Sequence, residues 1–235
     1  MSSSQKIKEI YLLANTPKKG NRSRMSVLSE ANSNPYLKAH GLDLVDWRPW
    51  ESATIVEAKE LGKPILLSIG FLGSSGCKTM LKESFFNENT ANIINRSFFP
   101  IKVDKDSQPE VAKSYQIALQ FLTRNPTGWP LTIFLDPENL MPFFGGTFFS
   151  EHASQEIPAF RDLLLRITKS FEDQKKELAA QTLQLAENLA QLEIPQEDPR
   201  FTDDALLEAC LEAIRRQFDS QNGGFGRAPK FLMAH

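Results

Sequence analysis

The short apolar run PILLSIG, at residues 64–70, constrains the fold more than any other part of the 235-residue chain. It is bounded by Pro64 and Gly70 and contains no regular alternation of polar and apolar side chains. A run of this kind is typical of a strand that is covered on both faces. We therefore expect it to form the central strand of a sheet with helices on both sides.

The segments around this strand alternate between helical and strand patterns. Helices are expected at residues 52–61, 78–97 (in two pieces that break near 87–89) and 109–122, strands at 98–106 and 131–137, and a hairpin of two strand halves around a glycine pair at 142–150. This order predicts an α/β fold with a mixed central sheet flanked by helices.

The chain divides into five predicted regions. These are a basic N-terminal extension at 1–25, the α/β domain at 26–157, one long amphipathic helix at 158–193, a polar linker at 194–201, and a helix with a glycine-rich turn at 202–235. One helix and a turn cannot bury their own apolar face, because isolated helices of this length are marginal in water. The chain is therefore expected to stop just inside a second, all-helical domain.

Charge and hydropathy exclude several classes of protein. With 27 basic and 29 acidic side chains, the formal net charge of -2 gives no overall attraction to nucleic acid. No apolar stretch approaches the ~20 residues that cross a bilayer, so no membrane span is expected. Two distant cysteines, Cys77 and Cys210, favour a reducing compartment. We expect a cytoplasmic location, with organelle targeting by the basic N-terminus as the alternative.

The turn after the central strand carries the candidate site. Residues 74–77 read Ser-Ser-Gly-Cys and directly precede a helix. A thiol in the first turn of a helix is activated by free N–H groups and the helix dipole. Thioredoxin-type proteins use this place for a C-x-x-C pair. They also put a cis-proline opposite that turn, at a position that Trp129-Pro130 matches here.

Five blocks resemble a known family. They are NPYLKAHGLDLVDWRPW (34–50), KPILLSIGFLGSSGCKTMLKESF (63–85), IKVDKDSQPEV (101–111), GWPLTIFLDPENLMPFFGGTFF (128–149) and FDSQNGGFGRAPKF (218–231). Together they resemble the thioredoxin-domain family of spermatogenesis-associated protein 20 and its bacterial relatives, over residue 28 to the C-terminus. The resemblance implies a thioredoxin-like domain followed by an α/α-barrel like that of six-hairpin glycosidases, of which only the first helix is present.

The departures from the family pattern cluster at the candidate site. The family turn resembles C-H-W-C-H, whereas residues 74–78 read Ser-Ser-Gly-Cys-Lys. In the block resembling H-A-H-N-P-V-D-W, His40 is kept and Leu42 replaces the second histidine. The block resembling E-E-R-P reads Asp-Ser-Gln-Pro at residues 106–109. The resemblance therefore implies a degenerate redox site.

Thiol–disulfide exchange needs one exposed thiolate to attack and a second thiol to resolve the mixed disulfide. Ser74 cannot attack, because a serine hydroxyl does not ionise near neutral pH. Cys77 stands where the sheltered resolving thiol belongs, and Lys78 activates it only if its ammonium turns towards the sulfur. We expect a non-redox binding or scaffold module, with an unidentified protein or small molecule in the groove between residues 74–77 and 129–130.

Two alternatives stay open, a monothiol oxidoreductase using Cys77 and the N-terminal part of a carbohydrate-active two-domain protein. The candidate site residues are Ser74, Cys77, Ser75, Gly76, Lys78, Trp129, Pro130 and His40. We expect no cofactor and no metal, because His40 and His152 are too dispersed to form a ligand set. Asp104 and Asp106, next to lysines, are expected to form a solvated rim. The sequence does not define the oligomeric state.

Overall fold

The chain forms two compact units, Met1–Glu193 and Ile194–His235. The computed structural model describes residues 34–41, 44–153, 158–192 and 203–226. The predicted basic extension at 1–25 and linker at 194–201 lie outside the described residues.

A five-stranded mixed sheet forms the centre of the first unit. In sheet order the strands are β1 (Arg48–Pro49), β3 (Phe99–Asp104), β2 (Ile65–Gly70), β4 (Leu131–Leu135) and β5 (Pro142–Gly146). The first three run parallel, β4 is antiparallel to β2, and β5 is antiparallel to β4. Every residue of β2 is buried, which confirms the prediction of a covered central strand.

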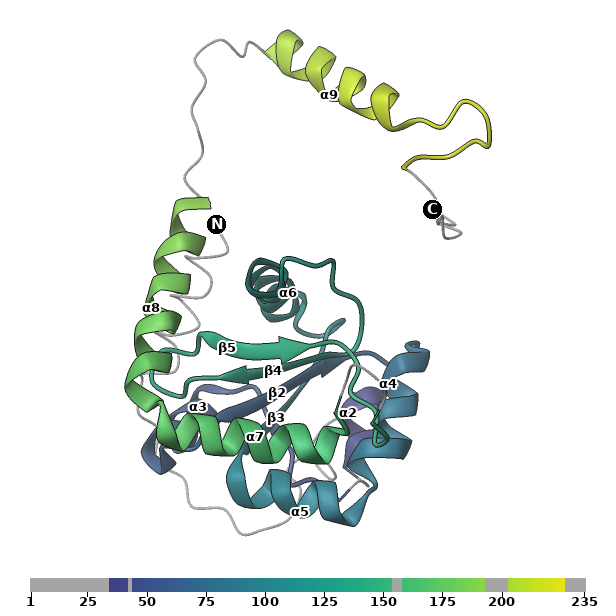
Figure 1. Cartoon of the computed structure of the whole chain (residues 1–235). Helices are drawn as coiled ribbons and strands as arrows, with labels where there is room; N and C mark the ends of the chain where they lie inside the picture. Colours follow the sequence, from purple (N-terminus) through teal and green to yellow (C-terminus); the bar gives the residue numbers. More distant parts are fainter. Residues whose placement is uncertain (1–33, 42–43, 154–157, 193–202, 227–235) are drawn as a thin grey trace. The chain divides into compact units, whose positions relative to one another are not determined.

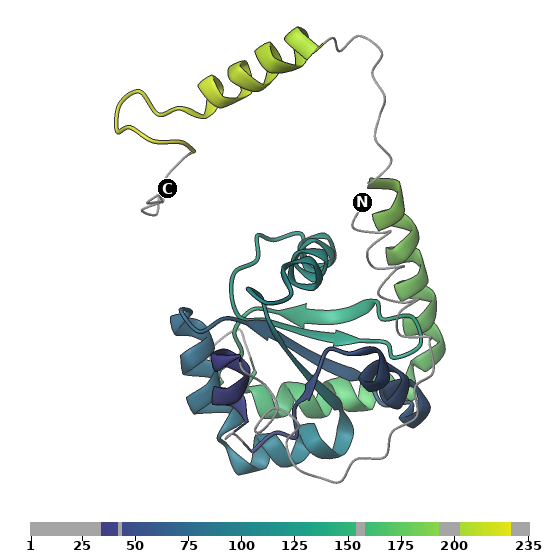
Figure 2. The same ribbon diagram turned by 180° about the vertical axis from the view of Figure 1, so that it is seen from behind.

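Helices cover both faces of the sheet, with α5 and α7 on the side opposite α6 (Figure 1); the view from behind shows the same layers (Figure 2). One face carries α2 (Pro35–His40), α4 (Ser75–Met80), the π-helical turn η1 (Leu81–Phe85), α5 (Glu88–Ser97) and α7 (Phe160–Asp173), and the other carries α3 (Ser52–Leu61) and α6 (Pro109–Thr123). Along β2, Leu66 packs into the first core, and Ile65 and Leu67 pack into the second. This is the thioredoxin-like fold predicted from the sequence.

Local side chains explain where several helices begin and end. Asn87 caps α5, because its Oδ1 accepts a hydrogen bond of 3.0 Å from the N–H of Thr90. This cap produces the predicted break between the two helical pieces. Pro109 opens α6, where its missing N–H costs no hydrogen bond. Gly62 ends α3 in the left-handed region, with φ of 61°.

The single long helix predicted over 158–193 is wrong. In the described part of this segment, α7 ends at Asp173 and α8 spans Lys175–Leu192, because the backbone of Gln174 leaves the helical region (φ -123°, ψ 29°). Residues 172–177 are all polar and exposed, so no apolar contact holds a straight helix across them. Beyond this break α8 packs its Leu185 and Leu189 against Ala118 of α6.

The hairpin predicted within 142–150 is also wrong, because residues 142–146 form one strand, β5, whose hairpin partner is β4. The glycine pair lies inside this strand instead of forming a turn. A Cβ at Gly145 would lie 2.9 Å from Cδ1 of Leu119 and 3.2 Å from the carbonyl oxygen of Thr132. The glycine therefore permits α6 to approach β5 closely.

The second unit holds α9 (Asp203–Gln217) and a turn after it. The side chain of Asp219 accepts hydrogen bonds from the N–H groups of Gln221 and Asn222, and Phe218 forms an isolated bridge with Phe225. The apolar side chains of α9 are exposed. Among the described helices of both units, none has the length and hydropathy required to cross a membrane.

The close approach at Gly145 generates a stability prediction. We expect Gly145→Ala to lower the free energy of unfolding by about 1–2 kcal/mol, because the added methyl group displaces Leu119 of α6. Gly128→Ala is the matched control, since a Cβ there meets no atom within 4 Å, and it should leave stability unchanged or slightly raised. Urea denaturation of both variants measures the difference, and equal effects would contradict the packing argument.

Candidate functional site

The Ser-Ser-Gly-Cys turn lies at the carboxyl end of β2 and begins α4. Ser74 is the N-cap of this helix, and its Oγ accepts a hydrogen bond of 3.2 Å from the N–H of Cys77. Both side chains are buried. The Ser74 hydroxyl therefore stabilises the first turn of this helix.

The sulfur of Cys77 points into the core of the first unit. The side chain is 4% exposed and belongs to the apolar cluster that includes Met80. A Cβ added at Gly70 would overlap both the Cys77 sulfur and the Tyr36 hydroxyl, so these two groups lie beside the end of β2. A free cysteine packed in this way acts as a small apolar residue.

The loop at Trp129 and Pro130 lies directly against this turn. The peptide bond between the two residues is cis. A Cβ at Gly76 would lie 2.9 Å from the Trp129 carbonyl oxygen and 3.2 Å from Cδ of Pro130. The structure thus brings residues 74–77 and 129–130 together, and the absence of a side chain at Gly76 permits their contact. Along α4, Ser75 and Lys78 are exposed, whereas Gly76 between them is half-buried and Cys77 is buried.

A pocket of about 460 Å³ opens beside Trp129, between the loop after β3 and the first turns of α6. Lys105 lines it, with its Nζ 4.7 Å from the ring centroid of Phe71 and 5.8 Å from that of Trp129. The same Nζ is 2.8 Å from Oδ1 of Asp106. The wall of the pocket therefore contains the Trp129 ring, and the paired ammonium group of Lys105 lies near this ring and that of Phe71.

The sequence interpretation missed Phe71 and Lys105. A signal for them was present, because Phe71 follows β2 and Lys105 follows β3. These strands are parallel neighbours, so the residues after their carboxyl ends meet at the same edge of the sheet.

Lys102, one of the two lysines next to the acids of the expected solvated rim, is buried, with 2% of its surface exposed. Its Nζ donates a hydrogen bond of 3.0 Å to Oγ of Ser68 on the neighbouring strand. The same Nζ lies 4.6 Å from the ring centroid of Phe85 and 4.7 Å from that of Trp47. In the sequence Lys102 stands between the apolar residues Ile101 and Val103, and this alternation is typical of a strand with one exposed face, so the local pattern gave no signal of its burial.

The two acids of the expected rim differ from each other. Asp104 is buried and accepts hydrogen bonds from Asn34 (2.6 Å) and Ser107 (2.7 Å), so the rim expectation is wrong for it. Asp106 is exposed and pairs with Lys105. Only Asp106 therefore lies at the surface beside the groove.

His40 lies in the core and not in the groove. Its ring centroid is 4.8 Å from that of Tyr36 and 6.2 Å from that of Phe85. Burial, and secondly the charge of Lys102, lowers the pKa of His40 far below its usual range, so the imidazole is neutral. In the described part of the chain, no cluster of three or more His, Cys, Asp or Glu side chains could hold a metal ion.

Sequence comparison identifies relatives of this chain. A family model described as Thioredox_DsbH, protein of unknown function, DUF255, matches residues 25–190. Spermatogenesis-associated protein 20 from Homo sapiens is 34% identical over 201 residues, covering 84% of this chain and 25% of the human protein. An uncharacterized protein from Caenorhabditis elegans is 36% identical over 201 residues, covering 86% and 27%. The chain spans about a quarter of the length of the curated relatives it matches.

Two solved structures are also similar in fold. A disulphide isomerase from Xylella fastidiosa Temecula1 is 20% identical with a TM-score of 0.38, covering 49% of this chain and 86% of that chain. A DsbH oxidoreductase is 13% identical with a TM-score of 0.39, covering 67% and 95%. Neither superposition is close enough to transfer any detail of the site.

The lowered pKa of His40 predicts a pH dependence of stability. Below the unfolded pKa of 6.5 the unfolded state binds the proton and the folded state does not, so stability is present above this pH and falls below it. The loss is at most about 1.4 kcal/mol per pH unit. We expect His40→Gln to lose less unfolding free energy than the wild type when urea denaturation is compared at about pH 7 and about pH 5.

His152→Gln is the matched control, because His152 is exposed, and it should behave as the wild type does. An NMR resonance of the His40 ring that titrates near neutral pH in the folded protein would contradict the argument.

Proposed function

The chain belongs to the Thioredox_DsbH family of proteins of unknown function (DUF255), and from this premise we propose that it is a binding module without dithiol redox chemistry. Its ligand, a protein or a small molecule, binds at the surface where the turn at residues 74–77 meets the loop at 129–130, beside the pocket that Trp129 lines. One observation carries the proposal, the combination of a capping serine at the attacking position with a buried cysteine after it.

The chemistry of the turn argues against thiol–disulfide exchange. In that reaction a thiolate displaces one sulfur of the substrate disulfide, and a second thiol then displaces the substrate from the mixed disulfide. Ser74 forms no disulfide, and its hydroxyl oxygen already accepts the N–H of Cys77. The Cys77 sulfur lies behind it, in the core. Within this turn, neither displacement step therefore has an accessible sulfur atom.

The surroundings of the turn support a retained binding groove. Gly76 lies against the Trp129 carbonyl, and the pocket beside Trp129 adjoins this contact. Phe71 and Lys105 extend the surface with one ring and one ammonium group. Half-buried aromatic side chains beside a concave surface are typical of binding sites, because they supply large contact area at low entropic cost.

The competing proposal is a monothiol oxidoreductase that forms mixed disulfides through Cys77. It requires the sulfur to meet a substrate disulfide from solvent, and the folded turn buries this sulfur. A carbohydrate-active role of the longer relatives is a further proposal. It concerns a region beyond this chain, which spans only about a quarter of their length.

A protein without an accessible pair of thiols should not reduce disulfides. We expect the wild-type protein not to reduce insulin disulfides at the rate of a C-x-x-C thioredoxin, as measured by turbidity. Ser74→Cys restores the missing thiol in the same cap position and should raise the rate clearly above wild type. Ser74→Ala, which removes the cap without adding a thiol, should stay inactive. A wild-type rate comparable to that of a dithiol thioredoxin would overturn the proposal.

The reactivity of the two cysteines towards a thiol reagent distinguishes a buried Cys77 from a reactive one. We expect a thiol reagent at neutral pH to modify Cys210 promptly in the native protein and to reach Cys77 only after unfolding, because Cys210 is exposed and Cys77 is buried. Cys210→Ser should therefore show no fast-reacting thiol. Rapid native modification of Cys77 in this variant would favour the monothiol oxidoreductase instead.

A further inference from the structure

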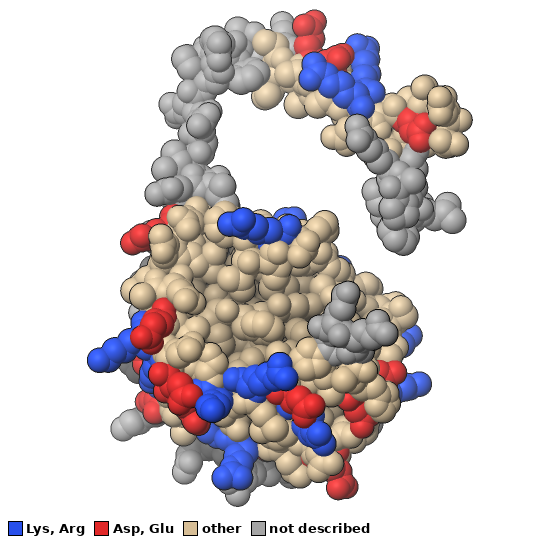
Figure 3. Space-filling view, in the orientation of Figure 1, with Lys and Arg blue, Asp and Glu red and all other residues tan. Residues whose placement is uncertain are grey.

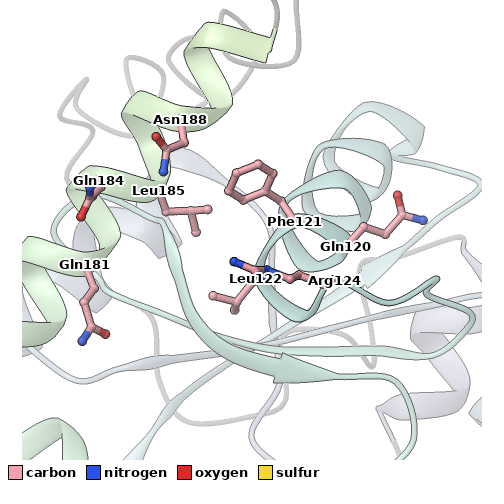
Figure 4. A pocket seen from close by; sticks show the side chains of 8 residues that line it. All are labelled: Gln120, Phe121, Leu122, Arg124, Gln181, Gln184, Leu185 and Asn188. Atoms are coloured by element: carbon pink, nitrogen blue, oxygen red, sulfur yellow. The ribbon is translucent and has the colours of Figure 1, made fainter.

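A second hollow, of about 600 Å³, lies between the C-terminal end of α6 and α8 (Figure 4). From α6 it is lined by Phe121, Leu122 and Arg124, and from α8 by Gln181, Gln184 and Asn188. We call it the α6–α8 groove. It shares no lining residue with the pocket beside Trp129, which lies at the N-terminal end of α6.

The polar groups of the α6–α8 groove are not engaged within the described structure. The carboxamides of Gln181, Gln184 and Asn188 make no hydrogen bond to another described residue, and Arg124 makes no ion pair with one. The space-filling view shows a face of the first unit that is largely free of charged side chains, with charges gathered at its borders (Figure 3). Arg124 is thus the one charged residue among those that line the groove.

The spacing of these groups fits a short extended peptide. Gln181 and Asn188 are seven residues apart on one helix, which is about 10 Å at the helical rise. Three residues of extended chain span about the same length. Carboxamides both donate and accept hydrogen bonds, as the peptide group does.

The last turn of α6 brings apolar and charged side chains to the groove. Phe121 is 40% exposed and Leu122 is 37% exposed, so both offer apolar surface. Arg124 follows them at the end of α6, with a left-handed φ of 56°. A guanidinium group binds a carboxylate through two parallel hydrogen bonds. A ligand that carries an apolar side chain next to a terminal negative charge would contact both kinds of group.

We propose that the α6–α8 groove binds the C-terminal tail of a partner protein. The last three residues lie extended along α8, the terminal carboxylate pairs with Arg124, and the last side chain packs on Phe121 and Leu122. A fatty acid fits less well, because its chain would desolvate the carboxamides of α8 without replacing their hydrogen bonds. The proposal does not depend on the groove at residues 74–77.

The test uses fluorescein-labelled hexapeptides that end in Leu, Phe, Ile or Val, each with a free C-terminal carboxylate and as the C-terminal amide. Fluorescence anisotropy should show saturable binding of at least one peptide, with the carboxylate form binding about tenfold or more tightly than the amide. Arg124→Asn should remove this preference, and asparagine is chosen because it tolerates the left-handed backbone. Arg166→Asn, an exposed arginine of α7, is the matched control and should keep the preference.

A second variant keeps the proposal testable if Arg124→Asn does not fold. Gln184→Ala should weaken binding of the carboxylate and amide forms by a similar factor, because it removes a contact to the peptide groups and not to the terminus. Three results would overturn the proposal: no saturable binding of any peptide, equal binding of the carboxylate and the amide, or an unchanged preference in folded Arg124→Asn.

Discussion

The buried ammonium group of Lys102 is the constraint on which the site depends. Removing a charged group from water costs several kcal/mol unless other groups replace the lost hydration. Here a hydroxyl from β2 and the rings of Trp47 and Phe85 surround it. These partners come from segments far apart in the sequence, so stabilising one charge fixes their relative positions. Because Phe85 belongs to η1, which directly continues α4, the same cluster also fixes the helix that carries Cys77.

Beside this fixed framework, three of the four residues of the turn have a structural role. Ser74 caps α4, Gly76 permits contact with the Trp129 carbonyl, and Cys77 fills the core. The family turn resembles C-H-W-C-H, which has a tryptophan at position 76. In the present geometry this side chain would collide with the Trp129 carbonyl oxygen. The packing of the turn is therefore complementary to the loop at Trp129 and to the core around Cys77.

The parts of the fold that local patterns specify were predictable from the sequence. The covered strand at residues 64–70 is an example, because continuous apolar character has few other interpretations. The burial of Lys102 was not predicted, since lysines are almost always exposed and its partners come from distant segments. The polar run at residues 172–177 permits a break, but the direction of α8 beyond Gln174 depends on its packing against α6, and the strand position of Gly145 depends on the approach of Leu119. Tertiary contacts decide such features, and a local pattern contains no information on them.

The helix α6 contributes to both surfaces for which binding is proposed. The two surfaces are nevertheless separate sites. Its N-terminal turns, as far as Gln116, line the pocket beside Trp129, and its C-terminal end, from Gln120, lines the α6–α8 groove, so the nearest lining residues are about 6 Å apart along the helix axis. Between these ends the helix is fixed, because Tyr115 donates a hydrogen bond of 3.0 Å to the Leu140 carbonyl and Leu119 packs against β5. A ligand at one end therefore requires no movement at the other, and the first unit can present two independent binding surfaces on one rigid support.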